Sequence, residues 1–221
     1  MKTVIVGIGK MGTQLALKLT LPRNTVLIDK YIDPRKIKQF EDKGMLYSDD
    51  LQDIKGADVI ILAVNPKDLD DLAKSIFALI LQKCLIINIA TNREIQSPNK
   101  YIATANIKII GEATAIENGI SPAIVIPNSI CTAVRDVIIE IFSTFGIVLQ
   151  KDISDYIDLN YNAAYYTIKA ISNTISLLHS KNLPEEIINI VVRNLMAGTC
   201  MSYPWPDDDD FIQRILKQNK I

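Results

Sequence analysis

Two neighbouring stretches of the sequence decide the fold: TVIVGIGKMG over residues 3–12 and TVLID over residues 25–29. The first is an apolar β-type run followed by the pattern G-x-G-x-x-G and a helical pattern, and the second is an apolar run that ends on an acidic residue. Gly7 permits a sharp turn from strand to helix, Gly9 lets a phosphate group approach the backbone, and Gly12 lets the helix pack closely against the strand. Amide groups at the start of the helix can then bind a pyrophosphate. The order of these parts predicts a dinucleotide-binding site.

The acidic residue that ends the second stretch bears on the choice of cofactor. Asp29 can accept hydrogen bonds from the adenosine ribose and would repel a phosphate on that ribose, so it favours NAD(H) over NADP(H). Lys30, Arg35 and Lys36 follow closely and could still hold such a phosphate. The alternative is that they belong to the exposed face of a helix over residues 34–43. The residues predicted to bind the pyrophosphate and the ribose are Gly7, Ile8, Gly9, Lys10, Met11, Gly12, Asp29 and Lys30.

Composition places the chain among ordinary globular proteins. Of its 221 residues, 48% are hydrophobic and 22% are charged, and the formal net charge is −1, which argues against a nucleic-acid or anionic membrane surface. The apolar run over residues 76–90 is interrupted by Gln82 and Lys83, so no membrane span is expected. Because the β-type run starts directly after Met1-Lys2, we expect no signal peptide. Three scattered cysteines without metal-ligand spacing indicate reduced thiols, no metal site and a cytoplasmic protein.

Strand and helix patterns alternate through the first two-thirds of the chain. Continuous apolar runs over residues 58–64 and 85–90 are typical of buried parallel strands, and residues 107–110 and 123–126 resemble later strands. Such alternation predicts an α/β fold with a doubly wound parallel Rossmann sheet, formed by a dinucleotide-binding domain over residues 1–150.

The pattern changes after Gln150. No proline or glycine occurs between Ser154 and Ser180, so one long helix is expected there, and Pro184 begins a second helix. Apolar residues recur at helical spacing along the long helix. A small helical domain with exposed apolar faces needs a partner to bury them, so we expect residues 151–221 to form an all-helical domain that builds a homodimer.

Several segments together resemble the pyrroline-5-carboxylate reductase family. They are GIGKMG at residues 7–12, ADVIILAVNPKDL at 57–69, IINIA at 86–90 and IFSTFG at 141–146. The resemblance implies a Rossmann domain followed by a helical domain of the 6-phosphogluconate-dehydrogenase type. It also implies that Val64, Asn65 and Pro66 line the middle of the cofactor, with Ala90 and Thr91 near the nicotinamide.

The chain departs from that family on the substrate side. Asn65 stands where the family usually has lysine, residues 109–111 replace a Met-Pro-Asn turn, and residues 160–163 replace a Gly-Ser-Gly-Pro segment. The loop that holds the substrate carboxylate in the family is not present before the chain ends. The resemblance therefore implies an NAD(P)-dependent oxidoreductase that transfers a hydride to or from a small imine or amino-acid-type substrate, with altered substrate loops.

Two alternatives remain open from the sequence. Lys169 and Asn173 lie four residues apart on one helix face, and the related β-hydroxyacid dehydrogenases carry this pair at this spacing, where it would supply proton transfer. The same face could simply be a solvated one. A non-catalytic NAD(P)-binding protein also fits the missing substrate loop. Of the other polar residues, His179 is expected at a helix end, and Glu112 or Glu117 could meet a cationic substrate at the edge of the sheet.

Overall fold

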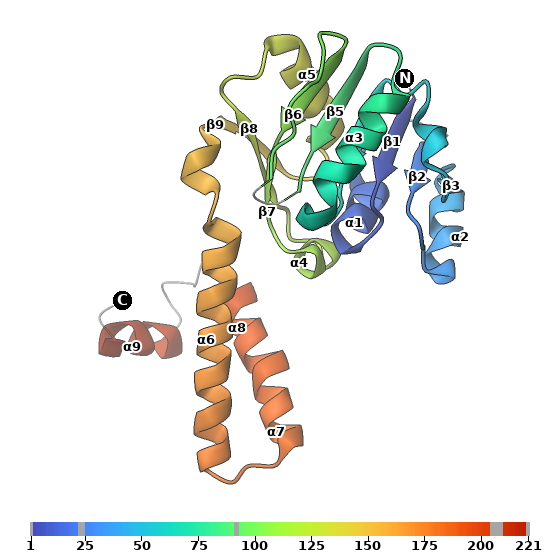
Figure 1. The fold of residues 1–221 in the computed structure, drawn as a ribbon. Coiled ribbons are helices and arrows are strands. Elements are labelled where there is room, and N and C mark those ends of the chain that lie inside the picture. Colours follow the sequence, from blue (N-terminus) through green and yellow to red (C-terminus); the bar gives the residue numbers. More distant parts are fainter. Residues whose placement is uncertain (1, 22–24, 91–92, 204–209, 220–221) are drawn as a thin grey trace. The chain divides into compact units, whose positions relative to one another are not determined.

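The computed structural model describes residues 2–21, 25–90, 93–203 and 210–219. The chain forms two compact units, Met1–Asn160 and Tyr161–Ile221, and each is described by itself (Figure 1). The sequence divides the chain into domains after residue 150, and this boundary stays a prediction. Among the described residues, no helix is long and apolar enough to cross a membrane.

The first unit is built on a six-stranded sheet in which every pair of neighbouring strands is parallel. The strand order is β3-β2-β1-β4-β5-β6, so the chain order reverses between β1 and β4. This arrangement confirms the predicted doubly wound Rossmann sheet. The strands are β1 (Thr3–Val6), β2 (Val26–Ile28), β3 (Leu46–Ser48), β4 (Val59–Leu62), β5 (Cys84–Asn88) and β6 (Ile102–Asn106).

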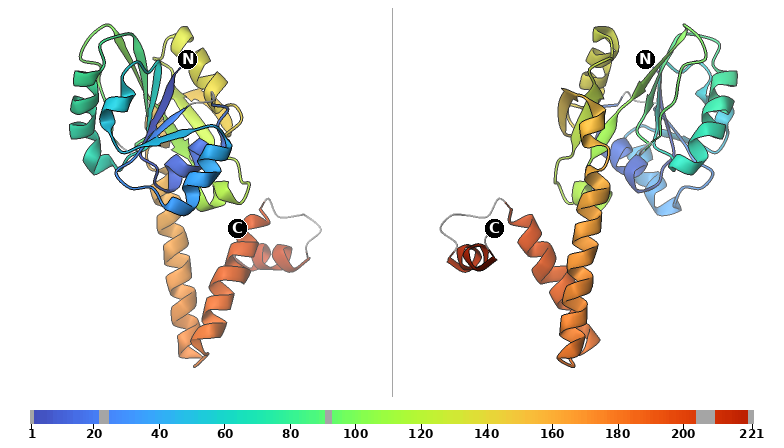
Figure 2. Two further views of the ribbon diagram at one scale, coloured as in Figure 1. Left: turned by 90° about the vertical axis from the view of Figure 1, so that its right-hand side faces the viewer. Right: turned by 60° about the vertical axis from the view of Figure 1, so that its left-hand side comes forward.

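Helices cover both faces of this sheet (Figure 2). Ile5 packs on one face in a cluster with residues of the helices α1 and α2, whereas Val4 and Val6 pack on the other face with Leu69 and Ile76 of α3. Because side chains alternate along a strand, a strand buried on both faces must be apolar throughout, as β1 and β4 are. The elements that connect these strands are α1 (Lys10–Lys18), α2 (Pro34–Asp42), the 3-10 turns η1 (Leu51–Ile54) and η2 (Pro66–Asp68), and α3 (Leu69–Leu79).

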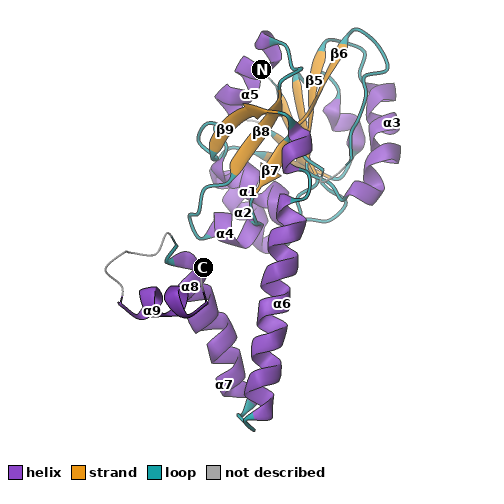
Figure 3. Cartoon of the chain, turned by 90° about the vertical axis from the view of Figure 1, so that its left-hand side faces the viewer, coloured by secondary structure: helices purple, strands orange, loops and turns teal. Residues whose placement is uncertain are grey.

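A second sheet of three strands corrects one detail of the sequence prediction (Figure 3). The runs at residues 107–110 and 123–126 were expected as later strands of the parallel sheet, but β7 (Lys108–Ile110) and β8 (Ala123–Pro127) pair antiparallel in this separate sheet. An apolar run reports burial and does not specify the strand with which it pairs, which explains the error. The remaining elements are α4 (Ala113–Glu117), α5 (Thr132–Phe142), β9 (Ile147–Lys151), which pairs parallel with β8, and the turn η3 (Ile153–Tyr156).

The second unit is helical, as predicted. Its long helix α6 (Leu159–Ser180) starts five residues later than the sequence pattern indicated and contains no buried residue. After it come α7 (Glu185–Ile190), a π-helical segment (Val191–Met196), α8 (Ala197–Met201) and α9 (Asp210–Asn219). Within the described part of this unit Ile188 is the only buried apolar side chain, so the apolar surface of the helices is largely unburied within the single chain.

Candidate nucleotide-binding site

The glycines of the G-x-G-x-x-G pattern have three different environments. Gly7 has a φ of +93°, and a Cβ there would lie 2.7 Å from the carbonyl oxygen of Ala63. At Gly12 a Cβ would lie 1.9 Å from the carbonyl oxygen of Gly7, so α1 packs against the loop that precedes it. At Gly9 nothing lies within 4 Å of a Cβ. The first and third glycines therefore permit the backbone geometry, and the second leaves open space for a ligand.

The open space at Gly9 lies at the start of α1. Gly9 is the N-cap residue of this helix, and its position receives no side-chain cap hydrogen bond. The amides of the first helical turn lack carbonyl partners inside the helix, and they carry the positive end of the helix dipole. Anionic groups bind at such positions, so the residues present fit a pyrophosphate.

Asp29 connects the end of β2 to the glycine-rich loop. One oxygen of its carboxylate, Oδ2, accepts a hydrogen bond of 2.6 Å from the backbone N–H of Ile8, and Oδ1 accepts one of 3.2 Å from the N–H of Tyr31. The hydroxyl of Tyr47 donates to the backbone carbonyl of Asp29 over 3.2 Å. The carboxylate of Asp29, which is predicted to bind the ribose, is therefore held in place by a hydrogen bond to the glycine-rich loop.

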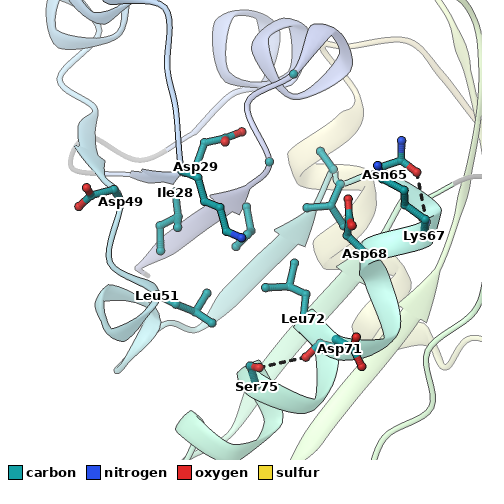
Figure 4. A pocket seen from close by; sticks show the side chains of 16 residues that line it. Ile28, Asp29, Asp49, Leu51, Asn65, Lys67, Asp68, Asp71, Leu72 and Ser75 are labelled. Atoms are coloured by element: carbon teal, nitrogen blue, oxygen red, sulfur yellow. Dashed lines mark hydrogen bonds between the residues drawn. The ribbon is translucent and has the colours of Figure 1, made fainter.

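A pocket of about 710 Å³ opens beside these residues at the carboxyl ends of β1, β2 and β4 (Figure 4). This is the point where the strand order reverses, at which open α/β sheets bind their ligands. Leu51 and Leu72 supply apolar surface on the side of η1 and α3. The charged groups that line the pocket are the carboxylates Asp29, Asp49, Asp68 and Asp71 and the ammonium groups of Lys30 and Lys67.

Six of the thirteen predicted cofactor residues line one pocket. Gly7, Gly9, Asp29 and Lys30 line the pocket, and Val64 and Asn65 line it from the opposite side. The side chain of Asn65 accepts a hydrogen bond of 3.1 Å from the N–H of Lys67, which caps the turn η2 that Pro66 begins. Lys10, Met11 and Gly12 form the first turn of α1, next to Gly9.

The predicted nicotinamide side is built around two asparagines that the sequence analysis did not single out. The N–H of Ala90 donates to Oδ1 of Asn88 over 3.0 Å, and Nδ2 of Asn88 donates to Oδ1 of Asn106 over 2.9 Å. Asn106 also accepts from the N–H of Ile95 and donates to its carbonyl. A signal was available for Asn88 alone, because it ends an apolar strand at the ligand-binding edge. Thr91 lies outside the described residues.

The other candidate residues have local roles or stand on the helical unit. Lys169 and Asn173 are exposed on α6, and their catalytic role stays a prediction. His179 Nε2 lies 2.7 Å from Oε1 of Glu185, a contact between the end of α6 and the start of α7. Glu112 caps α4, since its Oε2 accepts hydrogen bonds from the N–H groups of the next helical turn.

A metal site and a reactive thiol at Cys84 each require particular surroundings within the described part of the chain. In the described ranges no group of three or more histidine, cysteine, aspartate or glutamate side chains could hold a metal ion. Burial raises the pKa of the Cys84 thiol to about 12, so this cysteine is a neutral core residue at neutral pH.

Comparisons with known proteins agree with this geometry. Residues 2–92, less than half of the chain, match the sequence model of a family described as NADP oxidoreductase, coenzyme F420-dependent. No curated protein shows significant similarity to the sequence.

Solved structures resemble nearly the whole chain at low sequence identity. A pyrroline-5-carboxylate reductase from Coxiella burnetii has 15% identity and a TM-score of 0.66, with 97% of this chain and 84% of that chain covered. A pyrroline carboxylate reductase from Plasmodium falciparum, solved with NADP bound, has 15% identity and a TM-score of 0.64 over 100% and 84%. An imine reductase variant from Myxococcus stipitatus in complex with NAD+ has 15% identity and a TM-score of 0.59 over 98% and 77%.

Fold and pocket together define an α/β protein with a Rossmann sheet and a helical C-terminal unit. The similarity to the reductase structures confirms, at the level of the fold, the resemblance seen in the sequence. The chain has a pyrroline-5-carboxylate-reductase-like fold.

Proposed function

We propose that the protein is an NAD(P)-dependent oxidoreductase that transfers a hydride to or from a small imine or amino-acid-type substrate. The observation that carries this proposal is the open space at Gly9. It lies at the start of α1, which no side chain caps, and at the point where the strand order of the sheet reverses. The reductase and imine reductase names of the structural relatives support the same class of reaction.

The described residues define how the cofactor would be held. Amides of the first turn of α1 would bind the pyrophosphate, and Asp29 would accept hydrogen bonds from the adenosine ribose. Leu51 and Leu72 offer apolar surface for the adenine. Val64, Asn65 and Pro66 would line the middle of the cofactor, with Ala90 and Thr91 near the nicotinamide.

The charges around the pocket favour NAD(H) over NADP(H). Four carboxylates and two ammonium groups line it, which disfavours an additional phosphate. Arg35, a residue that could hold a 2′-phosphate, forms a bidentate pair with Asp33, in which Nη2 lies 2.7 Å from Oδ2. Lys36 donates to Oγ1 of Thr13 over 3.3 Å. The cofactor preference therefore rests on Asp29, on the excess of carboxylates in the pocket and on the ion pair that holds Arg35.

If the substrate is an imine, the reaction needs few catalytic groups from the protein. A bound nicotinamide supplies or accepts the hydride. A protonated imine is already electrophilic, so the protein needs chiefly to position it. An alcohol or ketone would need a proton donor, and Lys169 with Asn173 is the proposed source in a β-hydroxyacid-dehydrogenase-type enzyme.

We propose a homodimer formed through the C-terminal helices. Tyr161, Tyr165 and Ile168 follow one another at helical spacing on α6 and are exposed in the single chain. Covering them with a second copy would remove apolar surface from water. The three cysteines, none of them in a disulfide, agree with a proposed cytoplasmic location.

Titration of the purified protein with NADH and with NADPH, followed by nicotinamide fluorescence and thermal shift, tests the cofactor proposal. We expect NADH to bind more tightly, and Asp29→Asn to reduce the preference about tenfold, because a charge-assisted hydrogen bond is lost. The matched control Asp49→Asn removes a charge at the pocket rim without touching the glycine-rich loop. A preference for NADPH would overturn the choice of NAD(H). Failure of the folded protein to bind either cofactor would overturn the oxidoreductase proposal.

Lys169→Ala separates the two enzyme classes. An imine reductase should keep its turnover, whereas a hydroxyacid dehydrogenase should lose roughly 10²- to 10⁴-fold, the usual contribution of a general acid or base. Rates are measured on matched panels of cyclic imines and small hydroxy acids. Cofactor binding with no turnover on either panel would instead identify a non-catalytic NAD(P)-binding protein.

A further inference from the structure

A second hollow of about 530 Å³ lies between α1, α2 and α4. These three helices lie near one another in the first unit (Figures 1 and 3). The ammonium group of Lys36 in α2 donates to Thr13 of α1, and that of Lys18 in α1 donates to the carbonyl of Ile116 in α4. The hollow shares no lining residue with the nucleotide pocket, so it is a separate site.

The charge of this hollow is opposite in sign to that of the nucleotide pocket. Two acidic side chains line it against four basic ones, which leaves an excess of two positive charges. One of the acids, Asp33, is already paired with Arg35. Lys18 and Lys36 bond only neutral oxygens among the described residues, so their charges are not neutralised by these contacts. The lining cations are Lys10, Lys18, Arg35 and Lys36, and the acids are Asp33 and Glu117.

A buried amide points to a ligand as well. Gln14 of α1 is 6% exposed and lines the hollow. Within the part of the chain that the structure describes, no hydrogen bond joins its side-chain amide to another residue, and the amide atoms are not fully enclosed by protein, so they are open to a ligand in the hollow. An oxyanion in the hollow would accept a hydrogen bond from this amide and charge-assisted bonds from the lysines.

We propose that the hollow between α1, α2 and α4 binds a phosphate group, either as free inorganic phosphate or as a monoester of a small metabolite. The lysines supply the charge and Gln14 supplies a fixed donor. Lys10, in the first turn of α1, lines the hollow and does not line the nucleotide pocket.

The test is an NMR titration that follows the side-chain amide of Gln14 as inorganic phosphate is added at constant ionic strength. We expect a saturable shift that Lys36→Gln weakens about tenfold, because one charge-assisted hydrogen bond is lost. Lys36→Arg keeps the charge and should keep the binding. Lys38→Gln removes an exposed lysine of the same helix that does not line the hollow, and it should bind as the unmodified protein does.

A parallel titration with glycerol 3-phosphate distinguishes the two sources of the group. Tighter binding than that of inorganic phosphate assigns the site to a monoester, and weaker binding assigns it to the free ion. A linear shift, or equal responses of Lys36→Gln and Lys38→Gln, would overturn the proposal. Shifts confined to the backbone amides of residues 9–12 would also overturn it, because phosphate would then occupy only the nucleotide pocket.

Discussion

At the scale of single residues, the glycines of the glycine-rich loop differ in what a side chain would meet, in line with the separate roles that the sequence pattern predicts. Gly12 is required by packing, because a Cβ there meets the backbone oxygen of Gly7 at 1.9 Å. Gly9 is not required by packing, because nothing lies within 4 Å of a Cβ and its φ of −68° suits any residue. The structure therefore assigns Gly9 to ligand approach and Gly12 to the fold.

This difference can be measured with two alanine variants. Gly12→Ala should destabilise the protein by about 1–3 kcal/mol, the usual cost of overpacking, because α1 must move away from the loop. Gly9→Ala should keep the unfolding midpoint in urea but weaken binding of NADH, since its methyl group would occupy the space left for the pyrophosphate. Equal loss of stability in the two variants would contradict the assignment.

At the scale of elements, the sequence predicts those strands whose burial on both faces leaves an uninterrupted apolar run. The strands β1, β4 and β5 are of this kind, and the sequence predicted each of them at its observed place in the chain. The strand β6, with the sequence IATAN, was missed because small and polar residues carry no clear period. The strand β9 was missed because only its middle is even partly buried.

The same limit applies to the candidate site. Residues held by backbone rules, such as Gly7 and Gly12, can be predicted from a single sequence. The pair Asn88 and Asn106 could not, because the two residues meet only when β5 and β6 pair. A role for Lys169 depends on tertiary surroundings that a helical spacing does not specify.

The Asn88–Asn106 pair gives a prediction about the segment between β5 and β6. Asn106→Leu removes the acceptor of the Ile95 N–H and one of the two acceptors of the Asn88 amide, which keeps its bond to the carbonyl of Arg93. We expect a loss of about 1–3 kcal/mol of stability. Hydrogen exchange should become faster at Ile95. Thr104→Val changes a polar residue of the same strand that takes no part in the network, and it serves as the control. Unchanged exchange at Ile95 in Asn106→Leu would show that the network does not hold the segment.

At the scale of the whole molecule, the helical unit buries little apolar surface by its own packing. Ile168 is 63% exposed, and α6 buries none of its side chains within the chain. Most helical stability in proteins comes from packing of an apolar face, so a helix like this one needs a covering surface.

Light scattering coupled to size-exclusion chromatography tests the proposed homodimer. Ile168→Glu places a charge on the apolar face and should shift the protein to monomer, because burying an unpaired carboxylate in an interface is unfavourable. Asn173→Glu places the same charge on the exposed polar face of α6 that also carries Lys169, and it should leave the dimer intact. A dimer that persists in Ile168→Glu would remove α6 from the interface.

The hydrogen bond between Asp29 and Ile8 has a consequence for anyone who wishes to re-engineer the protein for NADP(H). Replacing Asp29 by an apolar or basic residue would remove the repulsive charge, but it would also leave the N–H of Ile8 without its acceptor. A redesign that keeps the loop intact would start at Asp33 instead. Asparagine there can still cap α2 while it releases the guanidinium of Arg35 from its ion pair. The change of coenzyme would then begin at Asp33, four residues after Asp29, the residue that the sequence motif singles out.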